Sequence, residues 1–268
     1  MSTSRGIFLT TLFVLLRFTP VVTALTVITG TSSLAPEGIH QITDLLIRLT
    51  LVLVAWSMSE GALMLWIRER NAGSSSAPGY GVVSVFFALL VLLSLLIFRA
   101  ASTQGMFLLL LGALSLRGAT RAGWEQGRPL TAVCTCLAAH SAVAALSFLI
   151  VLDNHLPWEG VAISLAVGSL MGAVETTWYA DALAGVRVGW LLPLYRLSLA
   201  LAPILIGTLA LAGRLPKVYL VIYLLFAVIA RTLRAISLDG RITPHLFGSV
   251  AMAYLLCLLI LTVCRIYS

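Results

Sequence analysis

Two acidic residues stand at the ends of long apolar runs, and their surroundings suggest chemistry. Glu60 closes one run and is followed by Arg68, while Glu175 closes another and is followed by Asp181 and Arg187. An anion held beside either segment would meet positive charge that can bind phosphate oxygens and a carboxylate that can hold a metal ion. We therefore take these segments as candidate binding sites, which the apolar runs must position.

The composition shows what kind of element the apolar runs are. The 268 residues are 60% hydrophobic and 10% charged, whereas a soluble domain is about 45–50% apolar and about 25% charged. The runs are about 15–26 residues long, which suits transmembrane helices rather than the shorter alternating strands of a membrane barrel. The sequence therefore predicts an all-α, polytopic membrane helical bundle in contact with the lipid bilayer.

We predict about nine transmembrane helices in a single domain, residues 1–268. The predicted spans are 7–29, 42–67, 82–98, 104–118, 128–152, 158–176, 189–212, 215–235 and 244–264. Because Arg17 interrupts the first run and no small-residue cleavage site follows it, we predict a span there rather than a signal peptide. Gly168 and Gly172 have the spacing of small residues that lets a helix pack closely on a neighbour.

Basic residues predict the orientation of the bundle. With a cytoplasmic N-terminus, the inner side holds Arg5, Arg68, Arg70, Arg117, Arg121, Arg128, Arg187, Arg231, Arg234 and Arg241, and the outer side holds Arg99, Arg214, Lys217 and Arg265. This inner excess is the bias that sets membrane topology, and an odd number of spans places the C-terminus on the opposite side. No aromatic residues interleave with a basic run, so we do not expect the net charge of +7 to serve nucleic-acid binding.

Several arginines lie where they could meet a ligand. Arg17 lies inside a span, where a charge costs about 2.5–3.5 kcal/mol, so it should face the bundle interior or extend towards the cytoplasmic surface. Arg117 and Arg121 belong to a predicted inner connection that continues to Arg128. They could bind a diphosphate through bidentate hydrogen bonds, or fix the topology and contact anionic lipid head groups.

His140 lies one turn after Cys136 in the predicted span 128–152. A buried histidine could bind a haem iron or a chlorophyll magnesium, but a single one more often hydrogen-bonds across helices, and we expect the latter. Cys134 and Cys136 should point to different faces of their helix. The spacing of the four cysteines predicts neither a metal site nor a disulfide framework.

The order of these features resembles the UbiA superfamily of membrane prenyltransferases. Members have nine helices, a cytoplasmic N-terminus, an Arg-Pro-like element in the first helix and Asp-rich motifs after helices two and six. Here the segment from Arg17 to Pro20 is similar to the first element, and Leu116–Gly127 resembles the family's Tyr-x-x-Lys-Arg region. Glu60 and Glu175 stand at the start of the two Asp-rich motifs.

Those motifs depart from the family pattern. Leu63 and Ile67 occupy the positions of the second and third aspartates in the first motif, so that only Glu60 is acidic there. The second motif keeps Glu175 and Asp181. Ionisation of a prenyl diphosphate needs Mg²⁺ to neutralise the departing charge, and two ions would need about two to four carboxylates. The resemblance thus implies Mg²⁺ as a cofactor only where enough of these acids act together.

The resemblance and its missing acids lead to two functional hypotheses. The first is a UbiA-like, non-catalytic subunit of a membrane complex that binds an isoprenoid, a quinone or a pigment. The alternative is a divergent Mg²⁺-dependent prenyltransferase that moves a prenyl group from its diphosphate to an aromatic or lipid acceptor. Its metal ligands would be Glu60, Glu175 and Asp181, and its substrate-binding residues would be Arg17, Arg68, Arg117, Arg121 and Arg187. A small transporter fits less well, because no inverted repeat is detectable.

Overall fold

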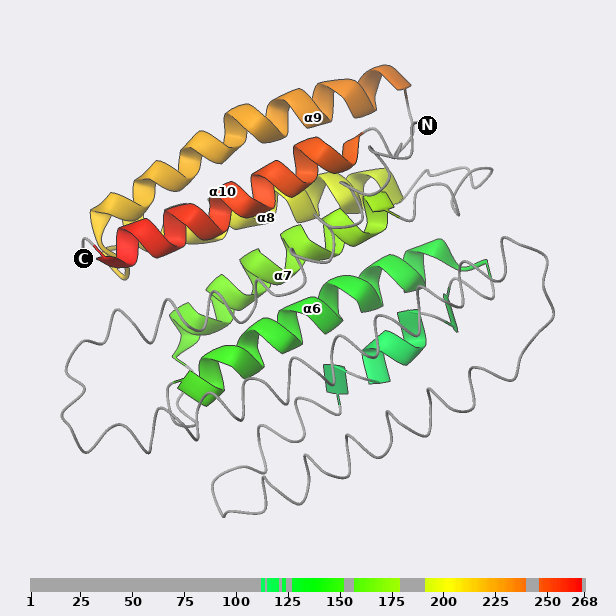
Figure 1. Ribbon diagram of the computed structural model, residues 1–268, viewed down its shortest axis with the longest axis horizontal. Helices are drawn as coiled ribbons and strands as arrows, with labels where there is room; N and C mark the ends of the chain where they lie inside the picture. The colour runs from blue at the N-terminus through cyan, green and yellow to red at the C-terminus, as the bar shows by residue number, and fades with distance from the viewer. Residues whose placement is uncertain are drawn as a thin grey trace, which may run out of the picture.

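The computed structural model describes residues 112–113, 115–120, 122–123, 127–151, 157–178, 191–239 and 246–266. Within these ranges every regular element is a helix and there is no strand (Figure 1). The elements are α6 (Pro129–Val151), α7 (Trp158–Trp178), α8 (Leu191–Leu211), the 3₁₀ helix η3 (Lys217–Leu224), α9 (Leu225–Asp239) and α10 (Phe247–Ile266). The stretches at 112–113, 115–120 and 122–123 are also helical.

The later predicted spans correspond to these helices. Spans 128–152, 158–176, 189–212, 215–235 and 244–264 match, in order, α6, α7, α8, η3 with α9, and α10. Three helices, at 129–146, 158–177 and 192–211, are long and apolar enough to cross a membrane. The described part of the chain therefore has the all-helical structure expected of an integral membrane protein. The predicted spans 7–29, 42–67, 82–98 and most of 104–118 lie outside the described residues, as do both chain termini.

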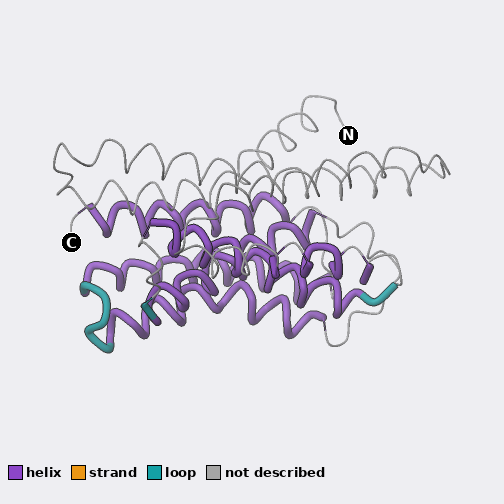
Figure 2. Tube along the Cα trace, turned by 90° about the horizontal axis from the view of Figure 1, so that it is seen from below, coloured by secondary structure: helices purple, strands orange, loops and turns teal. Residues whose placement is uncertain are grey.

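The helix α7 lies at the centre of the described bundle and packs against α6, α8 and α10. Figures 1 and 2 show the helices side by side with their long axes roughly aligned. Close packing of α7 on α6 depends on its glycines. A Cβ atom at Gly168 would overlap the backbone of Ser141, and one at Gly172 would lie 2.5 Å from Cδ2 of Leu137. The small-residue packing predicted for this helix is confirmed.

Polar contacts mark one end of the bundle, where α7 begins and α8 ends. Gly213, with φ +71°, follows α8 in the left-handed conformation, and the Arg214 N–H donates back to the Leu209 carbonyl at 2.9 Å. This geometry ends a helix without leaving its carbonyls unbonded. Arg214 then lies 5.7 Å from the ring centroid of Trp158 and 3.9 Å from the Glu159 carboxylate. An aromatic and charged pair of this kind suits a membrane interface.

The segment after α8 combines two helix types. Pro216 directly precedes η3. At the start of a helix the backbone N–H groups have no partner within the helix, so a proline there loses no hydrogen bond. A 3₁₀ helix rises about 2.0 Å per residue and an α-helix about 1.5 Å, so η3 and α9 together extend about 38 Å. That length is enough for the roughly 30 Å hydrocarbon core, which the 15 residues of α9 could not cross alone.

Apolar side chains lie both inside and outside the bundle. The largest fully buried side chains include Tyr195 and Tyr254, from α8 and α10. Large apolar side chains are also exposed on the same two helices, among them Leu197, Met252 and Leu259 at 54%, 58% and 57%. Such a surface would be unfavourable in water, whereas lipid chains cover it at no cost.

Candidate functional site

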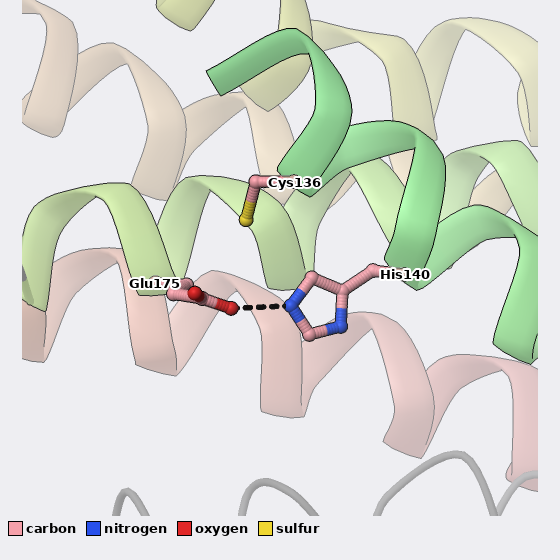
Figure 3. A group of neighbouring side chains, drawn as sticks. All are labelled: Cys136, His140 and Glu175. Carbon is pink, nitrogen blue, oxygen red and sulfur yellow. Dashed lines mark hydrogen bonds and ion pairs between the residues drawn. The ribbon is translucent and has the colours of Figure 1, made fainter. Parts of the chain in front are cut away.

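A buried cluster of polar side chains lies at the opposite end of α7 from Trp158. Glu175 comes from the last turn of α7, and Cys136 and His140 come from α6, where their spacing of four residues places them on one face. Arg117 comes from the helical stretch at 115–120. Because the start of α6 lies beside the end of α7, the two helices are antiparallel, and their close packing brings Cys136, His140 and Glu175 together (Figure 3).

Both carboxylate oxygens of Glu175 are bound by protein groups. Arg117 Nη1 donates to Oε1 at 2.5 Å, and His140 Nε2 lies 2.6 Å from Oε2. An ionised carboxylate can only accept, so we assign the imidazole proton to Nε2. Arg117 Nη1 also lies 3.9 Å from Cys136 Sγ. All four residues are buried, with 3% or less of each exposed.

Burial explains why these groups occur together. A charged side chain in an apolar interior is costly unless an opposite charge and hydrogen bonds compensate it. Arg117 and Glu175 neutralise each other, and His140 gives the second carboxylate oxygen a donor. Thr177, two residues beyond Glu175, shares a 2.5 Å hydrogen bond with the buried Tyr195 hydroxyl of α8. Polar contacts thus join the end of α7 to α6 and α8.

The described surroundings of Glu175 do not fit Mg²⁺. This ion takes oxygen ligands in near-octahedral geometry, whereas the groups around the carboxylate are a guanidinium, an imidazole and a thiol. Cys136, His140 and Glu175 do present ligand atoms that all lie within 4.8 Å of one another. Sulfur, nitrogen and oxygen together are the donor set of a softer ion such as Zn²⁺.

The structure brings together two of the predicted site residues, Arg117 and Glu175. Arg117 was expected in a connection where it could meet a diphosphate or lipid head groups, yet it is helical, buried and bound to Glu175. The other predicted residues lie outside the described part of the chain: Arg17, Arg68, Arg121 and Arg187 among the basic ones, and Glu60 and Asp181 among the acidic ones.

The predictions for α6 can be compared directly with the structure. His140 forms the expected hydrogen bond across helices, to Glu175. Cys134 is exposed and Cys136 is buried, so they do point to different faces. The prediction for the cysteines considered only their spacing from one another, and it therefore missed the grouping of Cys136 with His140 and Glu175. The spacing of Cys136 and His140 was the available signal, but nothing local indicated that a carboxylate of another helix would join them.

The described residues define the class of protein: they are helical, include three helices long and apolar enough to cross a membrane, and enclose a buried, charge-balanced polar cluster. No family model matches the chain, and no curated protein or solved structure matches it. The likeness to the UbiA superfamily therefore rests on the sequence features described above.

Proposed function

We propose that this chain is a UbiA-like integral membrane protein that does not transfer prenyl groups and instead binds an isoprenoid, a quinone or a pigment as a subunit of a membrane complex. The observation that carries the proposal is the state of Glu175. Its side chain is 1% exposed, and its two carboxylate oxygens are each bound by a protein group, Oε1 by Arg117 and Oε2 by His140.

A metal-binding carboxylate must offer lone pairs to the ion. The resemblance places Glu175 at the start of the second metal motif, yet an arginine of the chain itself already holds it. An arginine that pairs with the motif acid is also withdrawn from binding a diphosphate. One ion pair thus removes one candidate from each half of the prenyltransferase site, a metal ligand and a substrate cation.

The sequence of the first motif supports the same conclusion. Leu63 and Ile67 stand where the family has aspartates, so that Glu60 is its single acid. Mg²⁺ typically needs one or two carboxylates per ion beside the substrate phosphates. With Glu175 bound to Arg117, Glu60 and Asp181 leave at most one carboxylate for each of two ions, which is the lower limit. The apolar helical layout, which suits an isoprenoid tail, does not depend on these acids.

The test compares turnover with ligand content. The full chain is purified in detergent, and radiolabelled prenyl diphosphate with Mg²⁺ is added in parallel with an EDTA control. We expect no Mg²⁺-dependent release of pyrophosphate. Organic extraction followed by mass spectrometry should find an isoprenoid, a quinone or a pigment in near-stoichiometric amount.

Two outcomes would contradict the proposal. The first is Mg²⁺-dependent consumption of the diphosphate that Glu60→Gln abolishes and Glu159→Gln preserves. Glu159 suits the control because it is an acidic residue of α7 that lies at the opposite end of the helix from Glu175. Such a result would establish the prenyltransferase alternative. The second is protein that purifies alone and contains no such ligand, which would remove the support for a binding subunit.

A further inference from the structure

Three potential metal ligands lie together inside the bundle. Cys136 Sγ, a ring nitrogen of His140 and a carboxylate oxygen of Glu175 all lie within 4.8 Å of one another, and all three residues are buried. Figure 3 shows the thiol directed towards the contact between the imidazole and the carboxylate. Two of the ligands are fixed on one face of α6 at the spacing that helical metal motifs use.

The dimensions suit a small tetrahedral ion. Zn²⁺ binds sulfur at about 2.3 Å and nitrogen or oxygen at about 2.0–2.2 Å, which places neighbouring ligand atoms about 3.3–3.6 Å apart. His140 Nε2 and Glu175 Oε2 are closer than this, at 2.6 Å. The other separations in the group are at most 4.8 Å. Changes of about 1 Å in these separations would bring the three atoms to the tetrahedral spacing.

A positive group already lies among the three ligands. Arg117 Nη1 is 2.5 Å from Glu175 Oε1 and 3.9 Å from Cys136 Sγ. A guanidinium and a divalent cation disfavour each other here, because both are positive and both would bind the one Glu175 carboxylate, Arg117 at Oε1 and the ion at Oε2. Arg117 therefore lies where it would compete with the ion for the Glu175 carboxylate.

We infer that Cys136, His140 and Glu175 form a binding site for a borderline-soft divalent cation of the Zn²⁺ type, and that Arg117 competes with the ion for Glu175. Binding releases the thiol proton of Cys136 to solvent. It also requires the His140 tautomer that carries its proton on Nδ1, which frees Nε2. Thiolate and carboxylate then balance the two positive charges of the ion, as a buried site requires. This site goes beyond the proposed function and does not depend on it.

The experiment uses Co²⁺ as a spectroscopic probe of the full-length protein in detergent micelles. A thiolate bound to Co²⁺ gives a charge-transfer absorption in the near ultraviolet, which a carboxylate or imidazole at the surface does not give. We expect this band in the wild type, its loss in Cys136→Ser and its retention in Cys134→Ser. Cys134 is the matched control, because it is an exposed cysteine on the same helix.

Arg117→Gln tests the competition. Removing the guanidinium should tighten Co²⁺ binding by about tenfold or more, and a tenfold change corresponds to only about 1.4 kcal/mol. Zn²⁺ should also raise the melting temperature of this variant more than that of the wild type, since an ion that binds only the folded state stabilises it. If Arg117→Gln does not fold, the comparison of Cys136→Ser with Cys134→Ser in the wild-type background decides.

Three results would overturn the inference: no charge-transfer band in any folded form, a band that survives Cys136→Ser, or Co²⁺ affinity that falls in folded Arg117→Gln. None of them bears on the bound isoprenoid or on prenyl transfer. The metal site and the proposed function can therefore fail independently.

Discussion

Replacing Arg117 with methionine tests the energetic role of the buried ion pair. Methionine keeps an unbranched side chain of similar reach and removes the charge. Glu175, which is 1% exposed, then keeps a single protein donor among the contacts described above, the His140 ring. Breaking a buried pair by removing one partner costs about 3–5 kcal/mol. Because His140 still binds one oxygen, we expect a loss near the lower limit, about 3 kcal/mol.

The double variant Arg117→Met with Glu175→Gln separates the pair from the packing. Gln keeps the shape of Glu and carries no charge, so the second change should recover about 2 kcal/mol of the first loss. The free energy of unfolding is measured by titration with a denaturing detergent in micelles, followed by circular dichroism. A double variant that is less stable than Arg117→Met would refute the reasoning.

The more exposed pair at the other end of α7 supplies the control. Arg214 and Glu159 are 3.9 Å apart and 61% and 21% exposed. A pair of this kind contributes about 0–1 kcal/mol, so Glu159→Gln should leave the free energy of unfolding nearly unchanged. If Arg117→Met costs no more than Glu159→Gln, the buried cluster does not depend on charge balance.

Two further predictions concern the packing of α7, and both are measured by unfolding in micelles. Gly168→Ala should lower the free energy of unfolding by about 1–3 kcal/mol, since its Cβ would overlap the Ser141 backbone. Gly248→Ala on α10 has no atom within 4 Å of its new Cβ and should be neutral or stabilise by up to about 1 kcal/mol; equal stability of the two variants would contradict the close helix contact. Tyr195→Phe should cost about 0.5–1.5 kcal/mol through its bond to Thr177. In the Tyr195→Phe background, Thr177→Val should lower the free energy of unfolding much less than it does in the wild type. If the losses of the two single variants simply add in the double variant, the result would argue against that bond.

The proposed function and the inferred metal site involve the Glu175 carboxylate in different ways. In the first, Arg117 holds Glu175 and thereby removes it from Mg²⁺ chemistry. In the second, a softer ion displaces Arg117 because it gains sulfur and nitrogen ligands that Mg²⁺ does not favour. Arg117→Gln removes the guanidinium from Glu175 without changing any of the three proposed ligands, so it isolates the competition between Arg117 and the ion.

The sequence alone predicted the helices of the described region and their approximate bounds. Length and continuity of an apolar run are local properties, and a bilayer converts them directly into spans because unpaired backbone polar groups are not tolerated in lipid. Local spacing also predicted the close packing at Gly168 and Gly172 and the opposite faces of Cys134 and Cys136. Hydropathy did not predict that the span from 215 to 235 begins as a 3₁₀ helix.

Only the tertiary structure decided which side chains meet. Arg117 and Glu175 are 58 residues apart, and His140 and Glu175 are 35 apart, so their contacts depend on the rotation and depth of separate helices. Taken singly, Arg117 had the predicted role of a cation for diphosphate, Glu175 that of a metal ligand, and His140 that of a histidine bonded across helices. Packing instead placed them in one cluster, because a buried charge is stabilised by the nearest opposite charge.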